Sequence, residues 1–197
     1  MFRAAPCWFA SLLCLATCLV QTSHAADSAA LKAAQKAYHE AGAAVVEMTQ
    51  SKKVDVAQVE AKVVAMEQGA VVLSRAYASK FPAGAKLIAT VIEHVAVVDA
   101  KGSVTALGPM KELSFQEIED QWHDGAYFKS HDLGVNFEDE ANEHFTDPIH
   151  TMVHPMMVLR AAMAFQKGQD AKDLQAMKDE MDEGMEQAEK MLEVLLK

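Results

Sequence analysis

The chain has 197 residues, of which 51% are hydrophobic and 23% are charged, and its 18 basic and 28 acidic residues give a net charge of −10. This length suits one domain, and the apolar content is sufficient for a buried core, which excludes global disorder. The acidic balance argues against nucleic acid and anionic membrane surfaces as partners, because both call for clustered Lys and Arg.

The N-terminus has the pattern of a secretory signal peptide. One Arg near the start is followed by an apolar run from Trp8 to Val20, which is too short for a membrane span but suits the apolar core of a signal. Small residues at Ser23 and Ala25 predict cleavage after Ala25. We therefore expect a signal peptide at 1–25 and a periplasmic or secreted protein without a membrane span.

Cysteine usage depends on this cleavage. All three cysteines, Cys7, Cys14 and Cys18, lie in the predicted signal peptide, so the mature protein has no disulfide, thiolate nucleophile or Cys-ligated metal. Lipidation at Cys18 is an alternative to simple cleavage. The remaining residues, 26–197, are predicted to form a single domain.

Helical periodicity dominates the first half of the mature chain. Apolar residues step by three and four through 27–50 and again from Val56 to Phe81, which predicts two antiparallel helices, the second with Asp55 as its N-cap. A third helix is predicted to begin at Pro82, a residue suited to the first turn.

Residues 95–107 are rich in valine and contain the turn-forming tetrapeptide Asp99-Ala100-Lys101-Gly102. This pattern favours a small β-hairpin with Gly102 at positive φ, and a longer third helix is the alternative. The spacing of Ser114 and Glu117 predicts a capping box that opens a short helix reaching about Trp122.

The second half predicts an irregular segment over 123–147 and then two helices. Asp147 and Pro148 are the expected N-cap and first residue of a helix that ends at Gly168, and the last helix should begin near Asp170. The predicted fold class is mainly α: an up-and-down four-helix bundle with a small β-hairpin and a long irregular segment between the third and fourth long helices.

The irregular segment and the helix after it carry an unusual set of side chains. Five of the seven histidines that follow the signal peptide fall within 123–154, together with seven acids and a single base, Lys129. Imidazole and carboxylate groups bind Zn, Cu(II), Ni, Mn and Fe. The five residues are His123, His131, His144, His150 and His154.

Spacing strengthens the metal hypothesis. His150 and His154 are four residues apart, so on a helix they lie one turn apart on the same face and can chelate one ion. Glu140 and His144 have the same spacing. In a continuous helix, Pro155 removes one backbone hydrogen bond and leaves the carbonyl of Thr151 free.

Other interpretations of this segment stay open. An acidic segment with several histidines can be a solvated surface, and His39 and His94 are expected to be structural. A haem with a His axial ligand is a further alternative. Met152 and Met156 share the helix with the His pair and are candidate ligands for Cu(I), whereas the methionines of the last helix are expected to fill the core.

These observations predict an exported protein that binds one Zn, Cu or Ni ion for buffering, delivery or sensing. The expected ligands are the pair His150 and His154, completed by His144 with Glu140 or His131, and by His123. A non-metal module for a small molecule or protein is the main alternative, and a metal-dependent hydrolase is a further one. Non-enzymatic binding is favoured, because no catalytic sequence motif is present.

Overall fold

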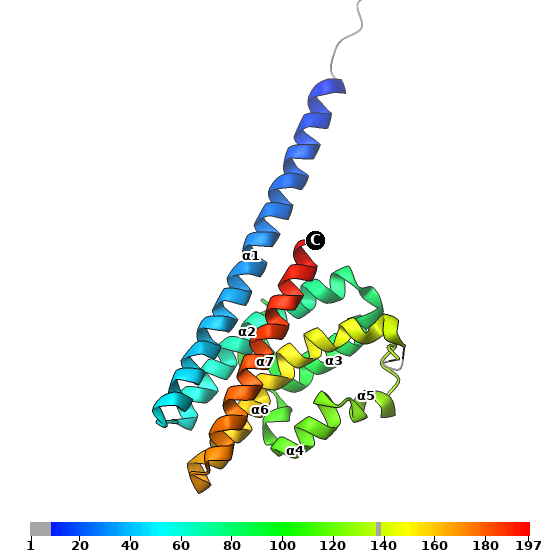
Figure 1. Ribbon diagram of the computed structural model, residues 1–197. Coiled ribbons are helices and arrows are strands. Elements are labelled where there is room, and N and C mark those ends of the chain that lie inside the picture. The colour runs from blue at the N-terminus through cyan, green and yellow to red at the C-terminus, as the bar shows by residue number, and fades with distance from the viewer. Residues whose placement is uncertain (1–8, 137–138) are drawn as a thin grey trace, which may run out of the picture.

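The computed structural model of the protein describes residues 9–136 and 139–197, with side chains described from residue 27 onward. This part of the chain is mainly helical, with seven α-helices and one antiparallel sheet of two short strands (Figure 1). The predicted mainly α class with a small hairpin is therefore confirmed. The predicted signal peptide, residues 1–25, lies outside the residues whose side chains are described.

Two long helices open the fold, α1 (Phe9–Ser51) and α2 (Val56–Lys80). The carboxylate of Asp55 accepts hydrogen bonds from the first amides of α2 at 2.9 and 3.3 Å, which confirms the predicted N-cap. The apolar residues at helical spacing are buried as the periodicity predicts: Tyr38, Ala41, Val45, Val59, Val63, Met66, Ala70, Leu73 and Tyr77.

The third helix begins slightly later than predicted. Pro82 starts a short 3-10 turn, η1 (Pro82–Gly84), and α3 (Ala85–Val95) follows it directly. The structural role of Pro82 is the expected one, since its fixed φ suits a first turn and its missing amide removes a donor that would have had no partner there.

The predicted hairpin is present, so the alternative of a longer third helix is wrong. Its strands, β1 (Ala96–Val98) and β2 (Val104–Leu107), are antiparallel. The side chain of Asp99 accepts hydrogen bonds from two backbone amides of the turn at 2.8 and 2.9 Å. Gly102 has a φ of 89°, the left-handed conformation expected of it.

Short helical pieces connect the hairpin to the second half of the fold. They are η2 (Pro109–Glu112), α4 (Phe115–Ile118), η3 (Glu119–His123), α5 (Ala126–Ser130) and η4 (Glu140–Phe145). The predicted capping box of Ser114 and Glu117 opens α4. The segment predicted to be irregular, 123–147, thus contains α5 and η4.

Helix α6 (Thr146–Gly168) is buried on nearly all sides, and α2, α3, α7 and several short elements pack around it. Asp147 is not the N-cap of α6, contrary to the prediction. Helix α6 continues directly from η4, so the carbonyls of that 3-10 turn can accept hydrogen bonds from the first amides of α6 and no capping side chain is needed. At the other end, α6 ends at Gly168 as predicted, and the residue after it, Gln169, is left-handed with a φ of 52°.

The last helix, α7 (Ala171–Leu196), begins where the sequence predicts. The side chain of Asp170 accepts a hydrogen bond from the amide of Lys172 at 3.0 Å and so caps it. Met177, Met181 and Met191 are fully buried, which confirms that these methionines fill the core.

The longest helices pack side by side (Figure 1). Helix α1 contacts α2 and α7, and α6 contacts the same two helices. Within the described residues, no helix combines the length and apolar content that crossing a bilayer requires.

One polar contact ties α1 to α6 at a backbone defect. Pro155 lies inside α6, which continues through it, and proline cannot donate a hydrogen bond to the carbonyl of Thr151. The hydroxyl of Tyr38 on α1 donates to that carbonyl instead, at 2.8 Å, in a fully buried position. The backbone acceptor that the sequence analysis expects to be free is thus satisfied by another helix.

Candidate metal centre

Three of the clustered histidines meet in space. His150 and His154 lie one turn apart on α6, and His123 is the last residue of η3, which packs against α6. One ring nitrogen from each of the three histidines lies within 4.8 Å of a ring nitrogen of each of the other two. The structure therefore places three imidazoles, from two separate elements, around a common point.

The backbone of η3 directs His123 toward α6. Residues Glu119–His123 form a π-helix, in which the amide of Asp124 bonds to the carbonyl of Glu119, five residues earlier, at 2.8 Å. A π-helix inserts one extra residue per turn, so it rotates the residues that follow it relative to an ordinary α-helix, and such turns recur at functional sites.

The three rings have a defined mutual orientation. The rings of His123 and His150 are stacked, with centroids 4.2 Å apart and planes at 8°. The ring of His154 stands nearly perpendicular to both, at 73° to His123 and 80° to His150. An ion at about 2.0–2.1 Å from each nitrogen requires nitrogens about 3.3 Å apart in a tetrahedral site, so the stacked rings of His123 and His150 have to rotate before both can bind one ion.

In each ring, one nitrogen contacts an oxygen atom that can accept a hydrogen bond from it. Nδ1 of His154 is 2.7 Å from Glu180 Oε2, and Nδ1 of His123 is 3.1 Å from Asp124 Oδ1. Nε2 of His150 is 3.3 Å from the carbonyl oxygen of His123. When these nitrogens donate, the second nitrogen of every ring keeps its lone pair, which is the usual arrangement of histidine ligands in metal sites.

His154 shows the arrangement most clearly. Its side chain is 1% exposed, and its Nε2 is buried with no hydrogen-bond partner among the described residues. A buried polar atom without a partner is uncommon, because its desolvation is not offset by a hydrogen bond. The atom lies 3.9 Å from Oε2 of Glu183, whose side chain is 61% exposed.

Helix α7 supplies the two carboxylates because it passes close to α6 at Gly184. A Cβ atom at this position would lie 2.8 Å from the hydroxyl of Tyr38 and 3.1 Å from Cβ of His154. The absence of a side chain therefore lets α7 approach, and it brings Glu180 and Glu183 beside the imidazole of His154.

Burial controls the charge of the site. Burial, together with the neighbouring rings of His123 and His154, which disfavour a second positive charge, lowers the pKa of His150 to about 4. His150 is therefore neutral near neutral pH, and a neutral imidazole is the form that binds a metal ion.

The other predicted ligands lie elsewhere. His144 contacts the hydroxyl of Tyr77 through Nδ1 at 2.9 Å and packs against aromatic rings. His131 is exposed and stacks on Tyr127, with ring centroids 4.0 Å apart. Glu140 is exposed on η4. None of the three belongs to the group formed by His123, His150 and His154 among the described residues.

Sulfur ligands are poorly placed for this centre. Met152 and Met156 are fully buried, and each is two residues away from a histidine of the pair. Residues two apart on a helix lie on different sides of it, so these thioethers face other parts of the core.

The sequence analysis did not identify Glu180 and Glu183. Both lie in the last helix, where acidic residues alternate with buried methionines along the whole length. No feature of the sequence separates these two acids from their neighbours, because only the packing of α7 on α6 selects them.

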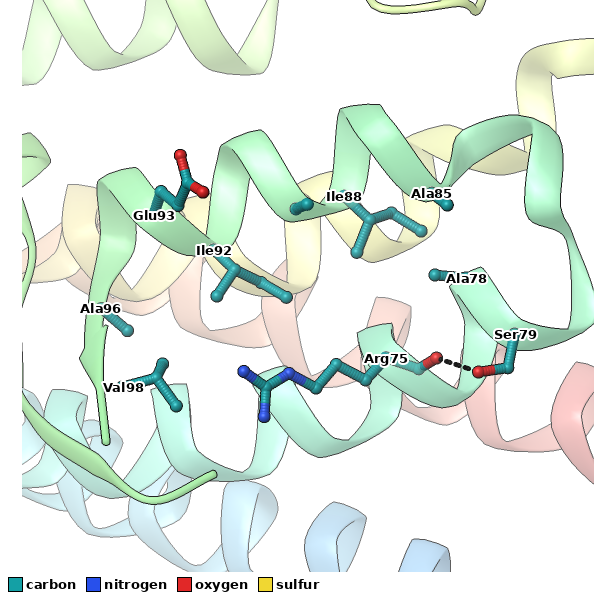
Figure 2. Close-up of a pocket in the computed structure, with 10 residues that line it drawn as sticks. Arg75, Ala78, Ser79, Ala85, Ile88, Ile92, Glu93, Ala96 and Val98 are labelled. Carbon is teal, nitrogen blue, oxygen red and sulfur yellow. Dashed lines mark hydrogen bonds between the residues drawn. The ribbon is translucent and has the colours of Figure 1, made fainter. Parts of the chain in front are cut away.

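A hollow of about 580 Å³ lies between α2, α3 and β1 (Figure 2). Ile88 and Ile92 point into it from α3, and Arg75 extends along its α2 side. Glu93 directs its carboxylate away from Arg75 in this view (Figure 2). The hollow is lined by no histidine, so it is separate from the three-imidazole group.

No family model matches the chain, and neither a curated protein nor a solved structure is significantly similar to it.

Proposed function

We propose that the protein is an exported metal-binding protein that holds one transition-metal ion through His123, His150 and His154. The observation that carries this proposal is the convergence of three imidazoles from two separate elements, each of which also has one nitrogen against an oxygen atom and a second nitrogen left to bind. His131 and His144 also contact oxygen atoms, but among the described residues they belong to no such group.

The donor set favours a borderline metal ion. Imidazole nitrogen suits Zn, Cu, Ni and Fe, and a nearby carboxylate, such as that of Glu183, can add a hard oxygen donor. We propose Zn(II), Cu(II) or Ni(II) as the ion. Glu180 acts by orienting His154 through Nδ1, and Asp124 does the same for His123.

Buffering, delivery or sensing of the ion fits the site better than haem binding. The cavity next to the rings measures about 210 Å³, which is below the roughly 300–1,000 Å³ of pockets for drug-sized ligands. A bare ion needs no such pocket. We further propose that α1, α2, α6 and α7 form an up-and-down four-helix bundle, the scaffold on which such sites are commonly built between facing helices.

Export is part of the proposal and follows from the predicted signal peptide at 1–25. Mass spectrometry of the protein recovered from the periplasm tests it. A mature chain beginning at Ala26 is the expected result, and a protein retained in the cytoplasm with Met1 intact contradicts it.

Calorimetric titration of tag-free, chelator-treated protein with Zn(II), Cu(II) and Ni(II) tests the metal site. One ion per chain should bind with a Kd below about 1 µM, and the double variant His150→Ala with His154→Ala should lose that binding. The matched control is His131→Ala with His144→Ala, which removes the same number of imidazoles from the same part of the chain. Equal loss in both double variants, or no binding by the wild type, refutes the proposal.

A further inference from the structure

A small cavity lies directly beside two of the three imidazoles. Its volume is about 210 Å³, and it is formed where η3 and α5 meet the first turns of α6. His123 and His150 line it together with Phe128, Lys129 and Ile149. The cavity is therefore next to the proposed ion, and it carries one cationic and two large apolar side chains.

We propose that this cavity binds a short aliphatic carboxylate, which coordinates the metal ion through one carboxylate oxygen. The inference rests on the metal site proposed above and names the ligand class of that site. It follows from three properties of the cavity: an open coordination position, a cation without a partner, and an apolar floor.

The open position follows from the number of ligands. Three imidazoles leave at least one position of a four-coordinate ion unfilled, and catalytic and transport sites use this position for an external ligand. Since both His123 and His150 line the cavity, an ion held by them lies beside it. A carboxylate oxygen is a suitable ligand for Zn(II), Co(II), Ni(II) and Cu(II).

Lys129 supplies the attraction for an anion. Its side chain is exposed at the edge of the cavity, and its ammonium group has no hydrogen bond or ion pair with any described residue. The carboxylate of Asp124 also lines the cavity, but it contacts Nδ1 of His123 at 3.1 Å. With a divalent ion in place, the positive charges of the ion and Lys129 exceed the negative charge of Asp124. The charge next to the cavity is then positive, so an anion is the favoured ligand.

Phe128 and Ile149 define the rest of the ligand. They are 5% and 2% exposed, and they give the cavity an apolar surface against which methylene groups can pack. Thr146 also lines the cavity, and its hydroxyl donates a hydrogen bond to the carbonyl oxygen of Glu143 at 2.8 Å. A short alkyl chain therefore meets apolar contacts, and the limited volume excludes long acyl chains.

Glu183 is a competitor for the open position from within the protein. Its carboxylate is 3.9 Å from Nε2 of His154, on the α7 side of the group, and it does not line the cavity. Replacement by glutamine removes an anionic competitor. Glu183→Gln should therefore leave the binding of an external carboxylate unchanged or strengthen it.

Visible spectroscopy of the Co(II)-loaded mature protein tests the proposal, because the ligand-field bands of Co(II) respond to a new oxygen ligand. Butyrate should shift these bands in a saturable way, and butanol, which has the same chain length without the charge, should not. Butyrate should bind about tenfold more tightly than acetate, since two more methylenes are buried.

Two variants assign the response to the cavity. Lys129→Gln should weaken butyrate binding about five- to tenfold without changing Co(II) affinity, whereas Lys101→Gln in the hairpin turn should have no effect. Absence of a butyrate response in a protein that shows Co(II) bands overturns this inference alone. Equal responses in wild type and Lys129→Gln also overturn it, and failure to bind Co(II) at all overturns the proposed function with it.

Discussion

Two groups of histidines come from the same short part of the chain and differ in whether their rings converge. His123, His150 and His154 lie together, each with one nitrogen against an oxygen atom. His131 and His144 lie apart from them: His131 stacks on Tyr127 and contacts its carbonyl oxygen, and His144 contacts the hydroxyl of Tyr77. Rings of both groups contact oxygen atoms, so neither the density of ligand-type residues nor such contacts distinguish a site. The difference is that only the first three rings converge on one point.

The largest expected effect comes from removing a ligand of the first group. His123→Ala should weaken binding of Zn(II) or Cu(II) on the order of a hundredfold, because one of three nitrogen donors is lost. The counterpart in the second group, His131→Ala, should change the affinity by less than about threefold. Competition with a chelating dye measures both, and similar losses in the two variants break the distinction.

A smaller effect is expected from the oxygen that orients a ligand. Glu180→Gln keeps the size of the side chain and removes the charge next to His154 Nδ1, 2.7 Å away in the wild type. The metal affinity should fall about tenfold, which is typical for loss of a partner of a ligating histidine. The matched variant is Glu189→Gln, an exposed acid of the same helix, which should bind the ion as the wild type does. An unchanged affinity in Glu180→Gln shows that the contact has no orienting role.

Glu67 sharpens the comparison because it is a buried polar group without a hydrogen-bond partner among the described residues. It is 0% exposed, and neither carboxylate oxygen has a hydrogen bond among the described residues. Burial raises the pKa of Glu67 well above its ordinary value of 4.5, so the folded protein retains a proton that the unfolded chain releases. The stability contribution is therefore complete below about pH 4 and is lost as the pH rises.

Glu67→Leu should remove this pH dependence and raise the free energy of unfolding at pH 7 by about 1–2 kcal/mol, because a desolvated polar group is replaced by an apolar one. Urea denaturation between pH 4 and pH 9 measures both effects. A destabilised variant with an unchanged pH profile means that the carboxyl has a partner at neutral pH.

The smallest effect is expected in the second group. Burial raises the pKa of Tyr77 to about 12, so its hydroxyl is protonated and contacts both Nδ1 and the carbonyl oxygen of His144, at 2.9 and 3.1 Å. Tyr77→Phe should lower the free energy of unfolding by about 1 kcal/mol, the contribution of one ordinary hydrogen bond. The metal affinity should not change. A loss of affinity in this variant connects His144 to the ion and contradicts the grouping.

Local rules predicted much of the fold. Asp55, Ser114 and Asp170 cap the helices they were expected to cap, and Gly102 adopts the turn conformation that its neighbours predict. The pair His150 and His154 was also predictable, because their relative position depends only on the continuity of one helix. Such features are set by residues within a few positions of one another.

The remaining parts of the site depend on contacts between distant segments. The position of His123 depends on the π-helical turn of η3, for which the sequence provides no recognised pattern. The role of Glu180 depends on the close approach of α7 at Gly184. The predicted N-cap of α6, Asp147, was wrong because η4 leads directly into the helix and makes a capping residue unnecessary.

The hydrogen bond from Tyr38 to the carbonyl of Thr151 has a mechanical consequence for the molecule. Thr151 follows His150 directly and lies three residues before His154, so α1 holds the backbone between the two histidines of the proposed site. If α1 moves away, that buried carbonyl loses its hydrogen-bond donor at the turn that sets the spacing of the two rings. We therefore expect a displacement of α1 to disturb the geometry of the proposed site.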